Sequence, residues 1–176
     1  MRPALLSLLV ALLSCSRGST RSPDPSRQPV VAPAGSTLTG TIDGRAFVAR
    51  AALLVRTTEW QGGRVTARIH VFERPATCAD AEAAIPGERT IQIQFGVRWP
   101  VMPGSVWVAQ VGHDEWARPD STTIAFMKHG ASHVGSYAGG RIEVESASPT
   151  GGVLSVQATR TGQASASGSV HFAVCP

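Results

Sequence analysis

The chain has 176 residues, with 16 Lys and Arg against 12 Asp and Glu and a formal net charge of +4. This length suits one domain with a full hydrophobic core. The basic residues are scattered along the sequence, which argues against a nucleic-acid partner.

The first fifteen residues have the pattern of an export signal. Arg2 precedes an apolar run from Ala4 to Leu13, which has the length of a signal peptide's apolar region and is too short to span a bilayer. The run ends in Leu12-Leu13-Ser14-Cys15, which resembles the lipobox of bacterial lipoproteins. That resemblance implies cleavage before Cys15 and lipid on its sulfur and new amine. An ordinary secretory signal is the alternative.

A lipid on Cys15 implies attachment to a membrane without a spanning helix, because two or more acyl chains hold a protein stably. Ser16, the second residue after cleavage, resembles that of lipoproteins sorted to the outer membrane, so this location is favoured over the inner membrane. Residues 1–14 are then the signal peptide. Residues 15–36 are rich in Ser, Pro and Arg and predict a disordered tether to a domain at 37–176.

The chain has three cysteines, and if Cys15 carries lipid, Cys78 and Cys175 remain as a possible pair. An exported compartment permits a Cys78–Cys175 disulfide, which would pin the last strand at its end. Two unpaired thiols are the alternative. Cys175 falls on the polar face of its strand by alternation, so the bridge requires that strand to end or twist there.

From residue 37 onward, alternating apolar side chains predict β-strands. A first hairpin turns at Asp43-Gly44 and returns over 47–55 as a single strand. Further strands are expected at 65–71, 91–99, 106–109, 122–128, 140–145, 153–160 and 164–174. Thr77 to Asp80 resembles a capping box and predicts one short helix, which Pro86-Gly87 ends. The pattern predicts an all-β fold, an antiparallel β-sandwich or open barrel with one short helix.

Three stretches of this domain resemble small bacterial lipoproteins of uncharacterised function. They are the opening hairpin at 40–47, the strand at 140–144, and the closing strand at 168–175 with its cysteine. The resemblance implies a disulfide-linked β domain on a lipid anchor, and it carries no activity.

The densest group of chemically active side chains is His113-Asp114-Glu115-Trp116. These could be acid–base groups or ligands in one loop, although adjacent side chains seldom converge on one ion. A polar loop is the favoured interpretation, and a hydrolase using this loop is the alternative. His129 and His133 have the spacing of a zinc pair on a helix, but both flanks predict strands, so we expect no metal and no cofactor.

Aromatic residues give a second set of candidates. Trp99 and Trp107 lie in predicted strands and are expected in the core. Trp60 and Trp116 lie at a hairpin tip and in the polar loop, where they could stack on a sugar or anchor a protein. The alternative, that they fold back and cover the core, is slightly favoured. His70 and His171 lie on outward strand faces and are expected to be solvated.

Together these features predict a membrane-anchored lipoprotein of the cell envelope that acts as a non-enzymatic binding or assembly module. Its expected partners are the membrane, through the lipid, and an envelope protein or polysaccharide. A lipid-anchored hydrolase and an accessory subunit of an envelope complex are the alternatives.

Overall fold

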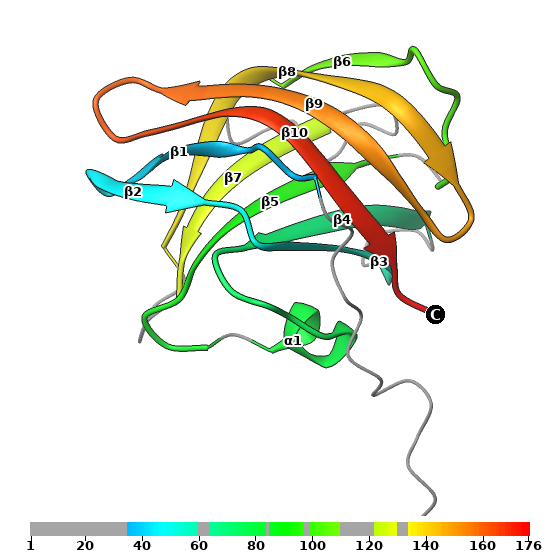
Figure 1. Cartoon of the computed structure of the whole chain (residues 1–176), viewed down its shortest axis with the longest axis horizontal. Helices are drawn as coiled ribbons and strands as arrows, with labels where there is room; N and C mark the ends of the chain where they lie inside the picture. Colours follow the sequence, from blue (N-terminus) through cyan, green and yellow to red (C-terminus); the bar gives the residue numbers. More distant parts are fainter. Residues whose placement is uncertain (1–34, 60–63, 84, 97–98, 110–121, 130–133) are drawn as a thin grey trace, which may run out of the picture.

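A computed structural model describes residues 35–59, 64–83, 85–96, 99–109, 122–129 and 134–176. These residues form ten strands and one short helix (Figure 1). In chain order they are β1 (Thr39–Ile42), β2 (Arg45–Val48), β3 (Ala51–Glu59), β4 (Arg64–Phe72), α1 (Cys78–Glu82), β5 (Arg89–Phe95), β6 (Val106–Ala109), β7 (Thr122–Lys128), β8 (Val134–Ser148), β9 (Gly151–Arg160) and β10 (Ala164–Val174).

Seven of the strands close into a barrel in the order β3-β4-β5-β7-β8-β9-β10. The sheet closes where β10 pairs with β3, through Ala173 with Leu53 and Val174 with Leu54. The expectation of an all-β fold with one short helix is therefore confirmed. The pairing at closure is parallel, unlike the wholly antiparallel sheet that was expected. The reason is geometric: the seven strands alternate in direction, so the first and last run the same way.

The strands are staggered around the barrel, and the stagger leaves room for an extra hairpin. On one side β9 pairs with β10 along its whole length from Ala164, whereas on the other side β3 pairs only with the last two residues of β10. The β1 strand fills the first part of that second edge, where Ile42 pairs with Ala164. The tilt that such a stagger requires is typical of small barrels.

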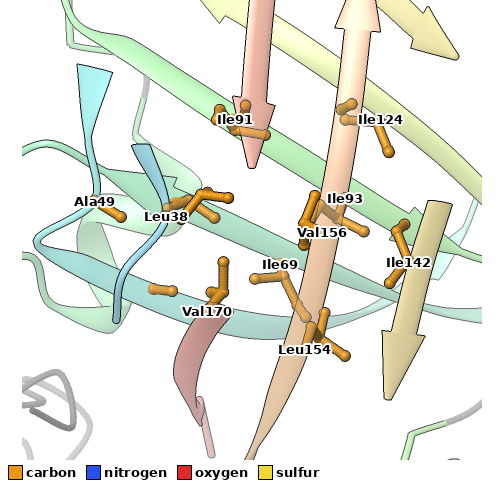
Figure 2. Packing of buried hydrophobic residues seen from close by; sticks show 14 of the residues in the cluster. Leu38, Ala49, Ile69, Ile91, Ile93, Ile124, Ile142, Leu154, Val156 and Val170 are labelled. Carbon is orange, nitrogen blue, oxygen red and sulfur yellow. The ribbon is translucent and has the colours of Figure 1, made fainter. Parts of the chain in front are cut away.

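Inward-facing side chains fill the barrel (Figure 2). They come from every strand of the barrel and from the β1–β2 hairpin, and include Leu38, Ile69, Ile91, Ile93, Ile124, Ile142, Leu154, Val156 and Val170. Trp99 is buried in this core, stacked edge-on against Phe172 with ring centroids 5.0 Å apart. Trp107 is partly buried and meets Phe95 at 5.2 Å. Both tryptophans therefore contribute to the core, as expected.

The single return strand expected over 47–55 is wrong, because two strands, β2 and β3, cover this stretch. Phe47 and Ala49 point into the core, and so do Ala52 and Leu54. In one continuous strand, an odd-numbered pair and an even-numbered pair would point to opposite faces. The chain therefore leaves the β conformation at Ala49 and Arg50, and both pairs reach the core. The amide of Arg50 donates to the carbonyl of Phe72, which passes the chain from the hairpin to the barrel wall.

The expected helix is present as α1, with the capping box of Thr77 and Asp80. The Asp80 carboxylate accepts hydrogen bonds of 2.6 Å from both the backbone N–H and the hydroxyl of Thr77. The helix ends at Glu82, before Pro86, and among the described residues no helix is long and apolar enough to cross a membrane.

Candidate functional site

A second apolar cluster lies outside the barrel, against α1. Here β3 presents apolar side chains on both faces: Ala52 and Leu54 enter the barrel core, whereas Ala51 and Leu53 join the outer cluster. Phe72, Ala76, Ala81 and Cys175 complete this outer cluster. Leu53 is fully buried on what would otherwise be the solvent face of the barrel. This part of the wall is therefore a packing surface for α1.

The expected Cys78–Cys175 disulfide is present in this cluster, with a Cα–Cα distance of 5.6 Å. Cys175 does lie on the outward face, as alternation predicts, and it is nevertheless buried. As expected, the strand ends here, at Val174, and α1 covers the outward face at this point. The bridge fastens the first turn of the helix to the end of the strand that closes the barrel.

Arg74 holds the same segment from its polar side. Its guanidinium lies 5.6 Å from the centre of the Phe72 ring and forms ion pairs with Asp80 at 3.0 Å and Glu88 at 2.7 Å. Burial acts to raise the pKa of Asp80, but hydrogen bonds from Thr77 and Arg74 outweigh burial and lower that pKa. These contacts stabilise the α1 segment on the barrel.

His70 lies on the outward face of β4, opposite Leu53 of β3 and Gln92 of β5. The expectation that it is solvated is wrong, since its side chain is buried and stacks on Phe72. Burial lowers the pKa of His70 to about 4, with smaller contributions from the charges of Arg68 and His129. The imidazole is therefore neutral at pH 7 and a weak base, which suits a packed polar group better than a proton-transfer catalyst.

Two neighbours of His70 carry hydrogen bonds across the same outer face. Arg68 donates from Nη2 to Oε1 of Gln94 at 3.2 Å. His129 is buried, and its Nε2 lies 3.1 Å from the hydroxyl of Thr90. The sequence signal for this polar layer is Phe72, a large apolar residue on the outward side of β4. Such a residue indicates that the barrel wall is covered there.

An open hollow of about 370 Å³ lies on the outer wall where the β8–β9 turn approaches β10. Its lining combines hydroxyl groups of Ser146, Ser148 and Thr150 with the ring of His171 and the side chain of Val153. The volume is within the range of small-molecule sites. The lining exposes more apolar than polar surface, so it suits a ligand that combines apolar area with a few hydrogen-bonding groups. His171 is half-buried here, so the expectation that it is solvated is met only in part.

The chain enters the described domain beside this hollow. Gly35 packs against the imidazole of His171, where an added Cβ would lie 3.1 Å from the ring. The Ser36 hydroxyl accepts a hydrogen bond from the His171 amide at 3.0 Å, and Thr37 exchanges hydrogen bonds with Ser169. Residues 35–37 therefore fix the entering chain along β10.

The remaining candidate residues lie outside the described part of the chain. These are the lipidation residue Cys15 and the candidate binding residues Trp60, His113, Asp114, Glu115 and Trp116. His133 of the expected histidine pair also lies outside it. Within the described ranges, no three His, Cys, Asp or Glu side chains gather where they could hold a metal ion.

Comparison with known proteins gives no match to any family model, curated protein or solved structure.

Proposed function

We propose that this chain is a lipoprotein of the cell envelope, held on a membrane by lipid on Cys15. In this proposal the barrel is a binding or assembly module rather than an enzyme. The lipobox-like Leu12 to Cys15 and the Ser- and Pro-rich residues that follow support a lipid anchor and a spacer. Ser16 favours the outer membrane as the destination.

The observation that carries the proposal is the Cys78–Cys175 disulfide. Structural disulfides persist in oxidising compartments and are rare in the cytosol, so the bridge supports export. It also accounts for both cysteines other than Cys15. The one cysteine left over is the one that the signal pattern assigns to lipid.

Three features of the barrel support binding over catalysis. The inner space is filled by side chains, so ligands would meet the outer wall and the rims. The hollow at Ser146 and His171 offers hydroxyl and imidazole groups at a fixed surface. His70, one of two buried histidines among the described residues, has a pKa of about 4 and suits packing.

The test is the chemical state and location of Cys15. The full chain, with its signal, is expressed in a bacterium with an outer membrane, and the N-terminal peptide is weighed by mass spectrometry. We expect a chain that begins at Cys15 and carries acyl groups, recovered with the membranes. Cys15→Ser should move the protein to the soluble fraction, whereas Ser19→Ala, a matched change in the same segment, should leave it on the membrane. An unmodified Cys15, or full retention of Cys15→Ser on membranes, would show that the anchor is wrong.

A pull-down of the lipidated protein from its own envelope addresses the binding role. We expect a specific envelope component that His171→Ala in the hollow weakens, while Arg56→Ala, an exposed change elsewhere, does not.

A further inference from the structure

Four cations that are far apart in the sequence gather at one rim of the barrel. Arg89, Lys128 and Arg160 each continue the inward-facing set of their strand by alternation, beyond Ile91, Phe126 and Ala158. Arg45 does the same on β2, where Phe47 points into the core. The β1–β2 and β9–β10 turns both lie at this end, on the left of Figure 1.

Strand register links these residues to one another around Ile42. Arg45 pairs with Ile42, Ile42 pairs with Ala164, and Ala164 pairs with Arg160. On the opposite wall Arg89 pairs with Lys128. Arg89 also reaches the carbonyl oxygens of Ile42 at 3.5 Å and Ala46 at 3.1 Å, which joins the two walls across the rim.

Two of the four cations are neutralised and hold the hairpin in place. Arg89 forms an ion pair of 2.7 Å with Glu73, and Lys128 lies 3.3 Å from the carboxylate of Asp43 in the β1–β2 turn. Glu73 and Asp43 supply the negative charge in these contacts. The remaining two cations leave the rim with an excess of positive charge.

Arg45 and Arg160 supply that excess. Within the part of the chain that the structure describes, neither side chain has an ion pair or hydrogen-bond partner. Arg45 is exposed and Arg160 is half-exposed. They stand three strands apart in one row, so their backbones are separated by roughly 14 Å. Two free cations spread along one rim, beside two further cations, can meet successive charges of a polymer.

The rim also lies away from the place where the chain enters the domain. Ser36 is bonded to His171, which is seven residues further along β10 than Ala164, or roughly 23 Å of strand. A domain held through its entering chain would therefore carry the basic rim at some distance from the anchor point.

We infer that this rim, with Arg45 and Arg160 as its free cations, binds an anionic polysaccharide. Guanidinium groups bind sulfate, phosphate and carboxylate groups through paired hydrogen bonds and stay charged at all physiological pH values. The choice of a polysaccharide over other polyanions rests on the proposed envelope location. The charge chemistry itself does not depend on lipid at Cys15.

The test uses the full chain and dextran sulfate as the probe, with neutral dextran of the same length as the comparison. We expect binding to dextran sulfate that weakens as salt is added, and no binding to neutral dextran. Because each exposed charge contributes a few-fold, Arg45→Gln combined with Arg160→Gln should weaken binding about tenfold. The control pair Arg56→Gln and Arg141→Gln removes the same charge from two exposed arginines, one at the opposite end of β3 and one on the outward face of β8, and should change binding less than twofold.

Three results would overturn the inference. These are equal losses in the rim and control pairs, equal binding of neutral dextran, or tighter binding to duplex DNA than to dextran sulfate at matched charge. Thermal unfolding of each variant shows that the exposed changes leave the fold intact. Cys15→Ser should bind as the original chain does, so a failed lipid anchor and a failed rim give different results.

Discussion

At the scale of single residues, His70 shows how tertiary packing changes the chemistry of a side chain. Alternation places it on the outward face of β4, where a histidine would ordinarily titrate near pH 6.5. Burial, with the positive charges of Arg68 and His129, lowers the pKa to about 4. The folded state therefore binds the proton less readily than the unfolded chain does.

This difference predicts how stability depends on pH. The contribution of His70 is fully present above its unfolded pKa of about 6.5, and it is lost as the pH falls through the folded pKa of about 4. The loss over this window should be up to about 3 kcal/mol. Urea unfolding between pH 7 and pH 4.5 measures this loss of stability. The carboxylate of Asp80, whose pKa is lowered, takes up its proton at lower pH values than these.

His70→Gln should flatten this pH dependence, and His171→Gln, at the half-buried histidine of β10, should preserve it. Equal slopes in all three proteins would contradict the assignment to His70.

At the scale of elements, α1 depends on the barrel rather than on its own length. Five residues are too few for an isolated helix to be stable in water. Its capping box, the ion pairs of Arg74 and the Cys78–Cys175 bridge fasten it to β3 and to the end of β10. In return it covers Leu53 and Phe72, which would otherwise expose apolar surface on the barrel wall.

Removing the bridge should therefore destabilise the domain while leaving it folded. Cys78→Ala with Cys175→Ala should lower the free energy of unfolding by about 2–5 kcal/mol, because the bridge closes a long loop in the unfolded chain. Urea unfolding with and without a reductant measures the effect. The reductant should lower the stability of the original chain by a similar amount and leave the double variant unchanged. A double variant as stable as the oxidised original would contradict this role.

At the scale of the whole molecule, stability depends on closure. An odd number of alternating strands closes only through a parallel pair, and here that pair involves just Ala173 and Val174 of β10 with Leu53 and Leu54. Further contact comes from the Cys175 amide, which donates to the Leu54 carbonyl at 2.8 Å. The last four residues therefore complete a barrel whose other pairings lie earlier in the chain.

Deleting residues 173–176 should abolish cooperative unfolding, because it removes the closing pair and the bridge together. The full-length Cys78→Ala, Cys175→Ala protein is the matched control, since it lacks only the bridge and should unfold cooperatively. Circular dichroism during heating distinguishes the two. A truncated chain with a sharp transition close to that of the control would show that closure contributes little.

Most of the described strands and turns could be predicted from the sequence, because they follow from local alternation and local turn chemistry. The single strand expected over 47–55, which folds as β2 and β3, is an exception. The Asp43-Gly44 turn, the Thr77–Asp80 cap and the inward face of β4 needed no knowledge of the fold. The cysteine count also predicted the Cys78–Cys175 pair by elimination, although the sequence could not show that the two residues lie within bonding distance. Position 60 and residues 113–116, which held its candidate binding side chains, lie outside the described residues.

What covers the outside of the barrel depends on long-range packing. Alternation predicts which face of a strand points outward but not whether another element covers that face. Leu53 is buried in the cluster with α1, and His70 is buried where its ring stacks on Phe72. Charge behaves in the same way. The rim cations are scattered in the sequence: Arg45, Arg89, Lys128 and Arg160. They lie at one rim because the strand register places the ends of distant strands at the same end of the barrel. Local pattern fixes each element, whereas long-range register fixes which side chains meet.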